Sequence, residues 1–340
     1  MKRKQAIAII IVCVILVCTG LIGVRSAKVL NDLKQKSSET AQQNLGSLVG
    51  KSMDTISVPS GDYIGQLNIV GTIQDSDQIT SYTLTENQYN HSLYMKFVDQ
   101  MMEDTNNKGI FLYVDSPGGT VYHSDELYLK LMEYKEKTSR PIYAYFANQA
   151  CSGAYYISMA ADKIYANRNC WTGSIGVIIS LMNYEKMLDK VGVAEIDITS
   201  GKNKTIGSAA HPMTKEQKEI LQSLVDEAYD QFTGIVADGR KMDIKKVKEL
   251  ADGRIYSALQ AKESNLVDEI MGFEDTKEAV TASFGDAKPE LFVPSDNTGW
   301  KVIFGNLFNT ANKFKQSSEI QAARDWIEQD ESGVLMYYAK

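Results

Sequence analysis

One serine of this chain lies in a setting suited to covalent catalysis. The segment 149–156 (QACSGAYY) places Ser152 among small residues, between a predicted strand and a predicted helix. A hydroxyl at a helix N-terminus faces a partial positive charge that favours a developing negative one, and the N–H of Gly153 would point at a carbonyl group under attack. An ordinary helix N-cap is the alternative role for this serine, and the two roles are compatible.

Two glycine-bounded turns could support such a nucleophile. Residues 115–119 (DSPGG) follow the apolar run 110–114 (IFLYV) and precede a predicted helix. Gly119 and the glycine before it let the backbone approach a ligand closely, so that exposed N–H groups can receive an oxyanion. An ordinary tight turn is the alternative. The other turn, 172–177 (TGSIGV), carries Ser174.

A base is also needed, because a serine hydroxyl is a weak nucleophile on its own. Residues 200–204 (SGKNK) carry Lys202 and Lys204 after a predicted strand at 194–199. A free lysine has a pKa of about 10.4 and is protonated at neutral pH, whereas burial in dry surroundings lowers a lysine pKa to about 7–8. A solvated pair of surface charges is the alternative for these two lysines.

The elements that would position these residues alternate along the chain. Strands are predicted at 63–70, 110–114, 141–146, 163–166 and 194–199, and helices at 93–102, 127–134 and 152–161. Capping boxes predict the start of two further helices, one formed by Thr214 with Gln217 and one by Ser257 with Gln260. This order is typical of a single α/β domain.

The motifs occur in a characteristic order. They are SPGG (116–119), SGAYYIS (152–158), ADKIYA (161–166), TGSIGV (172–177) and SGKNK (200–204), followed by GRIY (253–256) and NLVDEI (265–270). This order resembles signal peptide peptidase A, peptidase family S49, in its short single-domain form, over about residues 63–280. The resemblance implies a ClpP/crotonase-like α/β fold with repeated ββα units, a serine–lysine dyad and a homo-oligomeric ring.

The resemblance also implies a role for each site residue. Ser152 is the nucleophile and Lys204 the general base, the N–H groups of Gly119 and Gly153 form the oxyanion hole, and Ser174 orients the lysine. In the short form, Ser152 and Lys204 are expected to come from adjacent subunits of the ring. The implied substrates are hydrophobic peptides such as cleaved signal peptides, hydrolysed through an acyl-enzyme on Ser152.

Two residues depart from the family's pattern. Cys151 stands where alanine or another small residue is frequent, and Ala154 stands where glycine is common. Both residues are small, so we expect activity to be retained, and Cys151 could make that activity sensitive to thiol reagents. Cys151 could also pair with Cys170.

Other classes of function fit the sequence less well. A serine–histidine–aspartate triad would need His123 or His211, an acyl-CoA enzyme on the same fold would use Asp or Glu for proton transfer, and a non-catalytic membrane scaffold would need none of these motifs. The net charge of −7 argues against a nucleic-acid partner. No glycine-rich nucleotide motif, Cys-x-x-Cys or His/Cys cluster occurs, so we expect no cofactor and no metal.

The N-terminal residues carry a membrane signal. Residues 1–4 (MKRK) are basic, and residues 6–24 contain no charge and are rich in Ile, Val and Leu. A helix of this length spans a hydrocarbon core of about 30 Å, and the basic residues favour a cytoplasmic N-terminus with the catalytic domain outside the cytoplasm. A cleaved signal peptide, whose apolar stretch is about 7–15 residues, is the alternative.

Together these signals predict the organisation of the chain. We expect a cytoplasmic N-terminus at 1–4, a transmembrane anchor at 5–25, a polar stalk at 26–58, an S49-type serine protease domain at 59–285 and a C-terminal tail at 286–340. The tail ends in an apolar segment, 333–338 (GVLMYY), which could enter the active-site groove; simple packing is the alternative.

Overall fold

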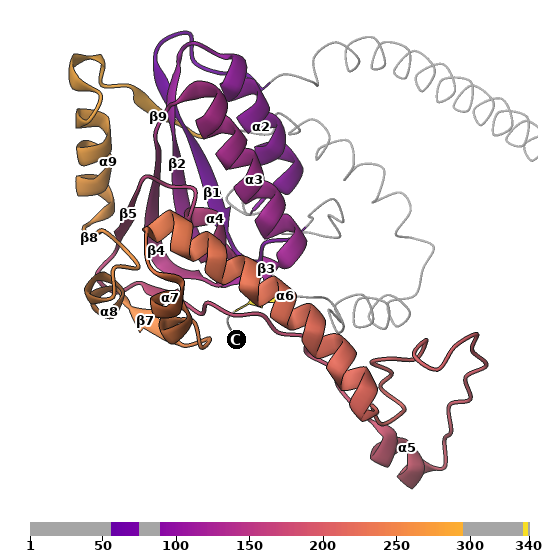
Figure 1. Ribbon diagram of the computed structural model, residues 1–340. Coiled ribbons are helices and arrows are strands. Elements are labelled where there is room, and N and C mark those ends of the chain that lie inside the picture. Colours follow the sequence, from indigo (N-terminus) through magenta and orange to yellow (C-terminus); the bar gives the residue numbers. More distant parts are fainter. Residues whose placement is uncertain (1–55, 75–88, 295–335, 339–340) are drawn as a thin grey trace, which may run out of the picture. The chain divides into compact units, whose positions relative to one another are not determined.

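The computed structural model of this protein describes residues 56–74, 89–294 and 336–338 (Figure 1). The chain divides into two compact units, Met1–Thr55 and Ile56–Lys340, and every described residue belongs to the second. The predicted anchor at 5–25 lies outside the described residues. Among those that are described, no helix has both the length and the apolar character needed to cross a bilayer.

A mixed, mostly parallel sheet of eight strands lies at the centre of this unit. Its strands are β1 (Tyr63–Val70), β2 (Asn107–Ser116), β4 (Ile142–Cys151), β5 (Lys163–Ala166), β6 (Trp171–Gly173), β7 (Ile255–Ser257), β8 (Glu269–Ile270) and β9 (Glu290–Phe292). The order along the main path is β7-β6-β4-β2-β1-β9, and β5 pairs with both β4 and β8. Every pair is parallel except β6 with β7. The predicted α/β class is therefore confirmed.

Helices cover both faces of this sheet (Figure 1). They are α2 (His91–Glu103), α3 (Val121–Thr138), α4 (Gly153–Ser158), α5 (Glu185–Val191), α6 (Lys215–Arg240), α7 (Ile244–Leu250), α8 (Ala258–Glu263) and α9 (Phe273–Ala282). Ile110, Leu112 and Val114 of β2 join the core beneath α2, α3, α4 and α6, whereas Phe111 joins a smaller cluster with Val280 of α9. This period of two is that of a strand covered on both faces.

The local sequence explains where the long helices begin and which side they bury. Helix α2 buries Tyr94, Phe97 and Met101 at helical spacing. Helix α6 begins at its predicted capping box, in which the N–H of Gln217 donates to the Thr214 hydroxyl at 3.2 Å and the N–H of Thr214 donates to the Gln217 side chain at 3.0 Å. The second predicted capping box, before α8, is confirmed as well.

Two predicted elements differ in the structure. Residues 194–199, predicted to form a strand, have no regular secondary structure, because no described strand lies beside them to supply hydrogen bonds. Ile196 and Ile198 are 85% and 99% exposed. The helix predicted at 152–161 is shorter, because the chain turns after α4 to begin β5.

A second sheet has only two strands. β3 (Gly118–Thr120) pairs antiparallel with β10 (Met336–Tyr338), and Tyr337 lies opposite Gly119. The described part of the C-terminal segment therefore lies along the glycine turn that the sequence marks as a candidate oxyanion site.

Candidate active site

Ser152 occupies the turn between the end of β4 and the start of α4. Its backbone has φ 54° and ψ −119°, the angles of the first central residue of a type II′ turn, where glycine is usual. The N–H of Ser152 donates to the carbonyl of Gly173 at 2.8 Å, which holds the turn against β6. A non-glycine residue in such a conformation stores about 1–3 kcal/mol of strain, and residues of this kind cluster at functional sites.

The hydroxyl of Ser152 is buried, and no described residue pairs with it. The residue is 1% exposed, and its Oγ makes no hydrogen bond with any residue that the structure describes. Leaving a buried hydroxyl unpaired costs about 1–3 kcal/mol. Backbone strain and an unpaired hydroxyl at the same residue are both accounted for if this oxygen is kept available for a reaction.

Gly153 directly follows this serine and is the first residue of α4. Its N–H has no partner within the helix, because the first four N–H groups of a helix lack an acceptor there. Gly153 is also buried. The predicted oxyanion donor is thus adjacent to the candidate nucleophile and needs an external acceptor.

Gly119, the other predicted oxyanion donor, lies between two backbone segments. The N–H of Ile73 donates to the carbonyl of Gly118, and the N–H of Thr120 donates to the carbonyl of Ile73, both at 2.8 Å. A Cβ on Gly119 would lie 1.9 Å from the carbonyl oxygen of Ile73, so only glycine fits. Because residues 118 and 120 face Ile73, the N–H of Gly119 faces the opposite edge of β3, where Tyr337 is paired.

The glycine strand and the serine turn belong to one neighbourhood. Helix α4, which begins directly after Ser152, contacts both β3 and β10. The structure therefore brings together the nucleophile candidate, the glycine strand and an extended segment of backbone paired with that strand.

Ser174 is fixed by the same set of turns. It has φ 48° and is buried, and its N–H donates to the carbonyl of Arg254 at 2.8 Å. The residue before it, Gly173, accepts the hydrogen bond from Ser152. Two serines with positive φ therefore follow the paired ends of β4 and β6, next to the hydrogen bond from Ser152 to Gly173.

Lys204 lies elsewhere in the chain. It is exposed, in a turn that is joined to the N-terminal end of α6 through Lys202, and its ammonium makes no hydrogen bond or ion pair with any described residue. Its neighbour Lys202 differs, because it forms an ion pair with Glu216 at 2.7 Å. Of the two lysines, Lys204 is the one left available for another partner.

Helix α6 separates Lys204 from the serine turn. Near its start, the Gln217 side chain donates to the carbonyl of Lys202; further along, the Gln231 side chain donates to the hydroxyl of Tyr156 in α4. At 1.5 Å per residue, these two points are about 21 Å apart along the helix. Within one chain, the structure does not bring Ser152 and Lys204 together.

The histidines offer no alternative base for Ser152. The His123 Nδ1 is 2.6 Å from the Thr120 hydroxyl, and the His123 ring packs against His91. His211 forms an ion pair with Asp197 at 3.2 Å. Since the Ser152 Oγ has no hydrogen-bond partner among the described residues, the geometry does not support a serine–histidine pair within this chain.

The predicted sensitivity of Cys151 to thiol reagents does not fit its surroundings. Both Cys151 and Cys170 are free and buried, and both thiols lie near the carbonyl of Trp171, at 3.6 and 3.3 Å. Burial raises the pKa of the Cys151 thiol to about 12. Because the thiolate is the reactive form, this cysteine is an inert packing residue at neutral pH.

Comparison with known proteins identifies the family. The model for peptidase family S49 matches residues 134–284, and the model for Clp protease matches residues 66–181. A protein of Enterococcus faecium named signal peptide peptidase SppA is 36% identical over 285 residues, which cover 82% of this chain and 81% of that protein. The chain belongs to peptidase family S49. The family predicted from the order of the motifs is confirmed.

Other relatives of this S49 peptidase cover different shares of its length. A protein of Synechocystis named protease slr0021 is 42% identical over 56% of this chain and 69% of its own length. Protease 4 of Haemophilus influenzae is 31% identical over 62% of this chain and 33% of its own length. A solved mutant ClpP1 of Listeria monocytogenes aligns with a TM-score of 0.41 and 15% identity, covering 62% of this chain and 92% of that structure.

The structure adds two positions that sequence reasoning did not single out. The carbonyl of Arg254 fixes Ser174, and the backbone of Ile73 fixes the strand of Gly119. Arg254 belongs to the GRIY motif, so the sequence marked this position. The motif did not indicate that the Arg254 carbonyl accepts a hydrogen bond from Ser174. Ile73 acts through its backbone alone, and its side chain carries no information about that role.

Proposed function

We propose that this S49 member is a membrane-anchored serine endopeptidase that binds its substrate as an extended strand along β3. The observation that carries the proposal is the pairing of β10 with β3, with Tyr337 opposite Gly119. An extended peptide that adds to a strand edge is held by backbone hydrogen bonds and needs no particular sequence there. A substrate in this place would pass the turn that holds Ser152.

The proposed nucleophile is the Ser152 hydroxyl and the proposed base is Lys204 of an adjacent subunit in a homo-oligomeric ring. Burial of the Lys204 amine at the subunit contact would favour its neutral form. The amine then takes the hydroxyl proton as Oγ attacks the scissile carbonyl carbon, and Ser174 orients the amine. Two observations support this: among the described residues, neither the Ser152 hydroxyl nor the exposed Lys204 ammonium has a partner within the chain.

The rest of the reaction follows from the same groups. The oxyanion of the tetrahedral intermediate would accept hydrogen bonds from the N–H groups of Gly119 and Gly153. Lys204 returns its proton to the leaving amine, which leaves an acyl group on Ser152. Water, deprotonated by the same lysine, attacks this ester and releases the second product. No cofactor or metal takes part in this chemistry.

The predicted anchor at 5–25 supports the choice of substrate. A domain held outside the cytoplasm at the membrane surface would meet apolar peptides as they leave the bilayer. Hydrophobic peptides such as cleaved signal peptides are therefore the substrates we propose, in agreement with the name of the Enterococcus relative.

Mixing two inactive variants tests the proposed assembly. We expect Ser152→Ala and Lys204→Ala each to abolish hydrolysis of a hydrophobic peptide. Mixed subunits should recover activity, because an intact Ser152 then meets an intact Lys204 from its neighbour. Lys202→Ala is the matched control and should remain active, since Lys202 is paired with Glu216.

Two results would contradict the proposal. Full activity of Lys204→Ala would exclude Lys204 as the base. Failure of the mixture to regain activity would exclude an active site shared between subunits. Labelling with a serine-directed covalent inhibitor, followed by mass spectrometry, checks the nucleophile separately. A label on Ser152 would also exclude a non-catalytic scaffold and an acyl-CoA enzyme.

A further inference from the structure

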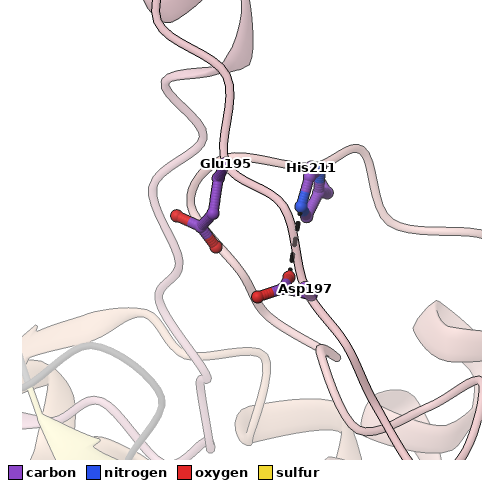
Figure 2. Close-up of side chains that lie close together, drawn as sticks. All are labelled: Glu195, Asp197 and His211. Atoms are coloured by element: carbon purple, nitrogen blue, oxygen red, sulfur yellow. Dashed lines mark ion pairs between the residues drawn. The ribbon is translucent and has the colours of Figure 1, made fainter.

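Two carboxylates and one imidazole meet on the segment that carries Lys204. The ligand atoms of Glu195, Asp197 and His211 all lie within 4.8 Å of one another (Figure 2). Glu195 and Asp197 precede the lysine turn in the chain, and His211 follows it. The three side chains therefore close a loop that contains Lys204.

This segment has no core of its own. Residues 178–209 include no buried residue. The two ends of the segment are joined by the N–H of Tyr184, which donates to the carbonyl of Ala209, and by the Asn183 side chain, which donates to the carbonyl of His211. Small units that lack a hydrophobic core are commonly stabilised by a metal ion, a disulfide or association, and both described cysteines lie outside this segment as free thiols.

The charges in the cluster are not balanced by the residues around it. The Asp197 carboxylate forms an ion pair with His211, whereas the Glu195 carboxylate, among the residues that the structure describes, accepts a hydrogen bond only from the hydroxyl of Ser208, at 3.5 Å. Two like charges held this close repel each other, and a divalent cation between them would remove the repulsion.

The kinds of donor atom identify a class of ion. An imidazole nitrogen and two carboxylate oxygens are all ligands that Zn²⁺ accepts, and where a protein supplies three ligands a water molecule occupies the fourth position. Neighbouring ligand atoms of a tetrahedral zinc ion with bonds of about 2.0–2.1 Å are about 3.3 Å apart. The distance between Asp197 Oδ2 and His211 Nε2 is close to this value, at 3.2 Å. Glu195 is exposed, so its side chain is free to close the remaining distance.

We propose that Glu195, Asp197 and His211 bind a divalent transition-metal ion, with Zn²⁺ as the preferred ion, and that the ion fixes the lysine-bearing loop. The ion has a structural role, because it joins residues on both sides of the turn and leaves the Lys204 amine untouched. The part of this inference that concerns Lys204 as a base rests on the proposed function; the metal site itself does not.

Metal binding is measured directly on the full chain, prepared without a histidine tag and freed of metal by a chelator. Titration with Zn²⁺ in a calorimeter, with the bound metal counted by mass spectrometry, should give one ion per chain. Asp197→Asn and His211→Gln should each weaken binding at least about 100-fold, since even outer-shell changes cost about 10–100-fold. Asp189→Asn, which removes an exposed carboxylate of α5, should bind as the parent does.

A second measurement reports on the loop and needs no peptidase activity. In a Ser152→Ala background, Zn²⁺ should slow tryptic cleavage after Lys202 and Lys204, and the addition of Asp197→Asn should remove this protection. Unchanged affinity in the Asp197→Asn/His211→Gln double variant would overturn the site. Binding without protection would overturn its role in fixing the loop. Full peptide hydrolysis by the Lys204→Ala protein, with metal binding intact, would contradict the proposed function alone.

Discussion

Ser152 combines two unfavourable features at a single residue, a positive φ of 54° and a buried hydroxyl without a partner in the part of the chain that the structure describes. The strain arises because the Cβ of an L-residue crowds the backbone in this region, where glycine is at ease. Neither feature helps the fold. Both become intelligible if the turn presents Oγ to a substrate that passes along β3.

Replacing this serine by glycine should therefore stabilise the protein while abolishing hydrolysis. We expect Ser152→Gly to raise the free energy of unfolding by about 1 kcal/mol, because it relieves backbone strain and removes the unpaired hydroxyl. Denaturant titration measures the change. Ser152→Ala is the control, since it removes the hydroxyl and keeps the strain. A glycine variant less stable than the alanine variant would contradict the account.

The thiol of Cys151 gives a prediction on alkaline stability. Its pKa is about 12 in the folded chain against a usual value of 9.0, because burial disfavours the thiolate. Between these two values the unfolded chain loses the proton and the folded chain keeps it, so stability falls as pH rises above about 9, by at most about 1.4 kcal/mol per pH unit. Unfolding measured from pH 8 to pH 10.5 should show a smaller decline in Cys151→Ala. An equal decline would be the contrary result.

At the scale of secondary structure, the pairing of β10 with β3 has a consequence for kinetics. The N–H of Gly119 faces β10, so Gly119 and Tyr337 are the kind of antiparallel pair that exchanges hydrogen bonds. If substrate binds along β3 as proposed, a tail strand in this place competes with it for the same edge. The competition is intramolecular and hence independent of protein concentration.

Removing one backbone donor from the tail should weaken that competition. Tyr337→Pro lacks the N–H opposite Gly119, and a backbone hydrogen bond contributes about 0.5–1.5 kcal/mol. We expect KM for an extended peptide to fall about 2–10-fold, with little change in kcat. Tyr337→Ala retains the N–H and is the matched control. If a chain ending at residue 332 showed the same KM as the parent, the tail would have no role in access.

Sequence patterns predicted those elements whose determinants lie close together in the chain. The capping boxes at Thr214 and Ser257 and the apolar run of β2 are local signals, and the structure confirms all of them. The alternation at 194–199 is also local, but a strand needs a neighbour, and no described strand provides one. The same limit applies to the site, where the backbone contacts of Ile73 depend on residues far apart in sequence.

For the site residues too, local features could be predicted and the arrangement in space could not. Small residues and glycines marked the turns of Ser152, Gly119 and Ser174, and the structure places each of them in a buried turn or strand. Their mutual arrangement and the exposure of Lys204 depend on the packing of α6 and could not be read from spacing. The proximity of Glu195, Asp197 and His211 could not be predicted for a similar reason, since His211 is distant in sequence from Glu195.

At the scale of the whole molecule, the segment before α6 exposes apolar side chains to solvent, which does not stabilise a monomer. Ile196 and Ile198 are almost fully exposed, and Met182, Met187 and Val191 are more than half exposed. Patches of this kind mark protein interfaces. Their position on the segment that carries Lys204 agrees with a contact between subunits there.

A charge placed in this patch should disrupt assembly and leave the subunit folded. Ile198 is 99% exposed, so we expect Ile198→Asp to change the free energy of unfolding of the subunit by no more than about 0.5 kcal/mol. Sedimentation should show smaller species, and peptide hydrolysis should fall with them. Leu259→Asp changes an exposed leucine of α8 and serves as the comparison. An Ile198→Asp protein that assembles and cleaves peptide normally would show that this patch is not part of the proposed subunit contact.

The shortness of β3 limits how much of a bound peptide the enzyme could recognise. Three residues, bounded on one edge by Ile73, leave room to align only a brief stretch of polypeptide. Recognition through main-chain groups at so few positions discriminates poorly between different side chains. It discriminates strongly between conformations, because the backbone groups of a folded protein already form hydrogen bonds with one another. If substrates bind along β3 as proposed, this peptidase would favour extended, unstructured peptides over folded proteins, which agrees with the proposed hydrolysis of cleaved signal peptides.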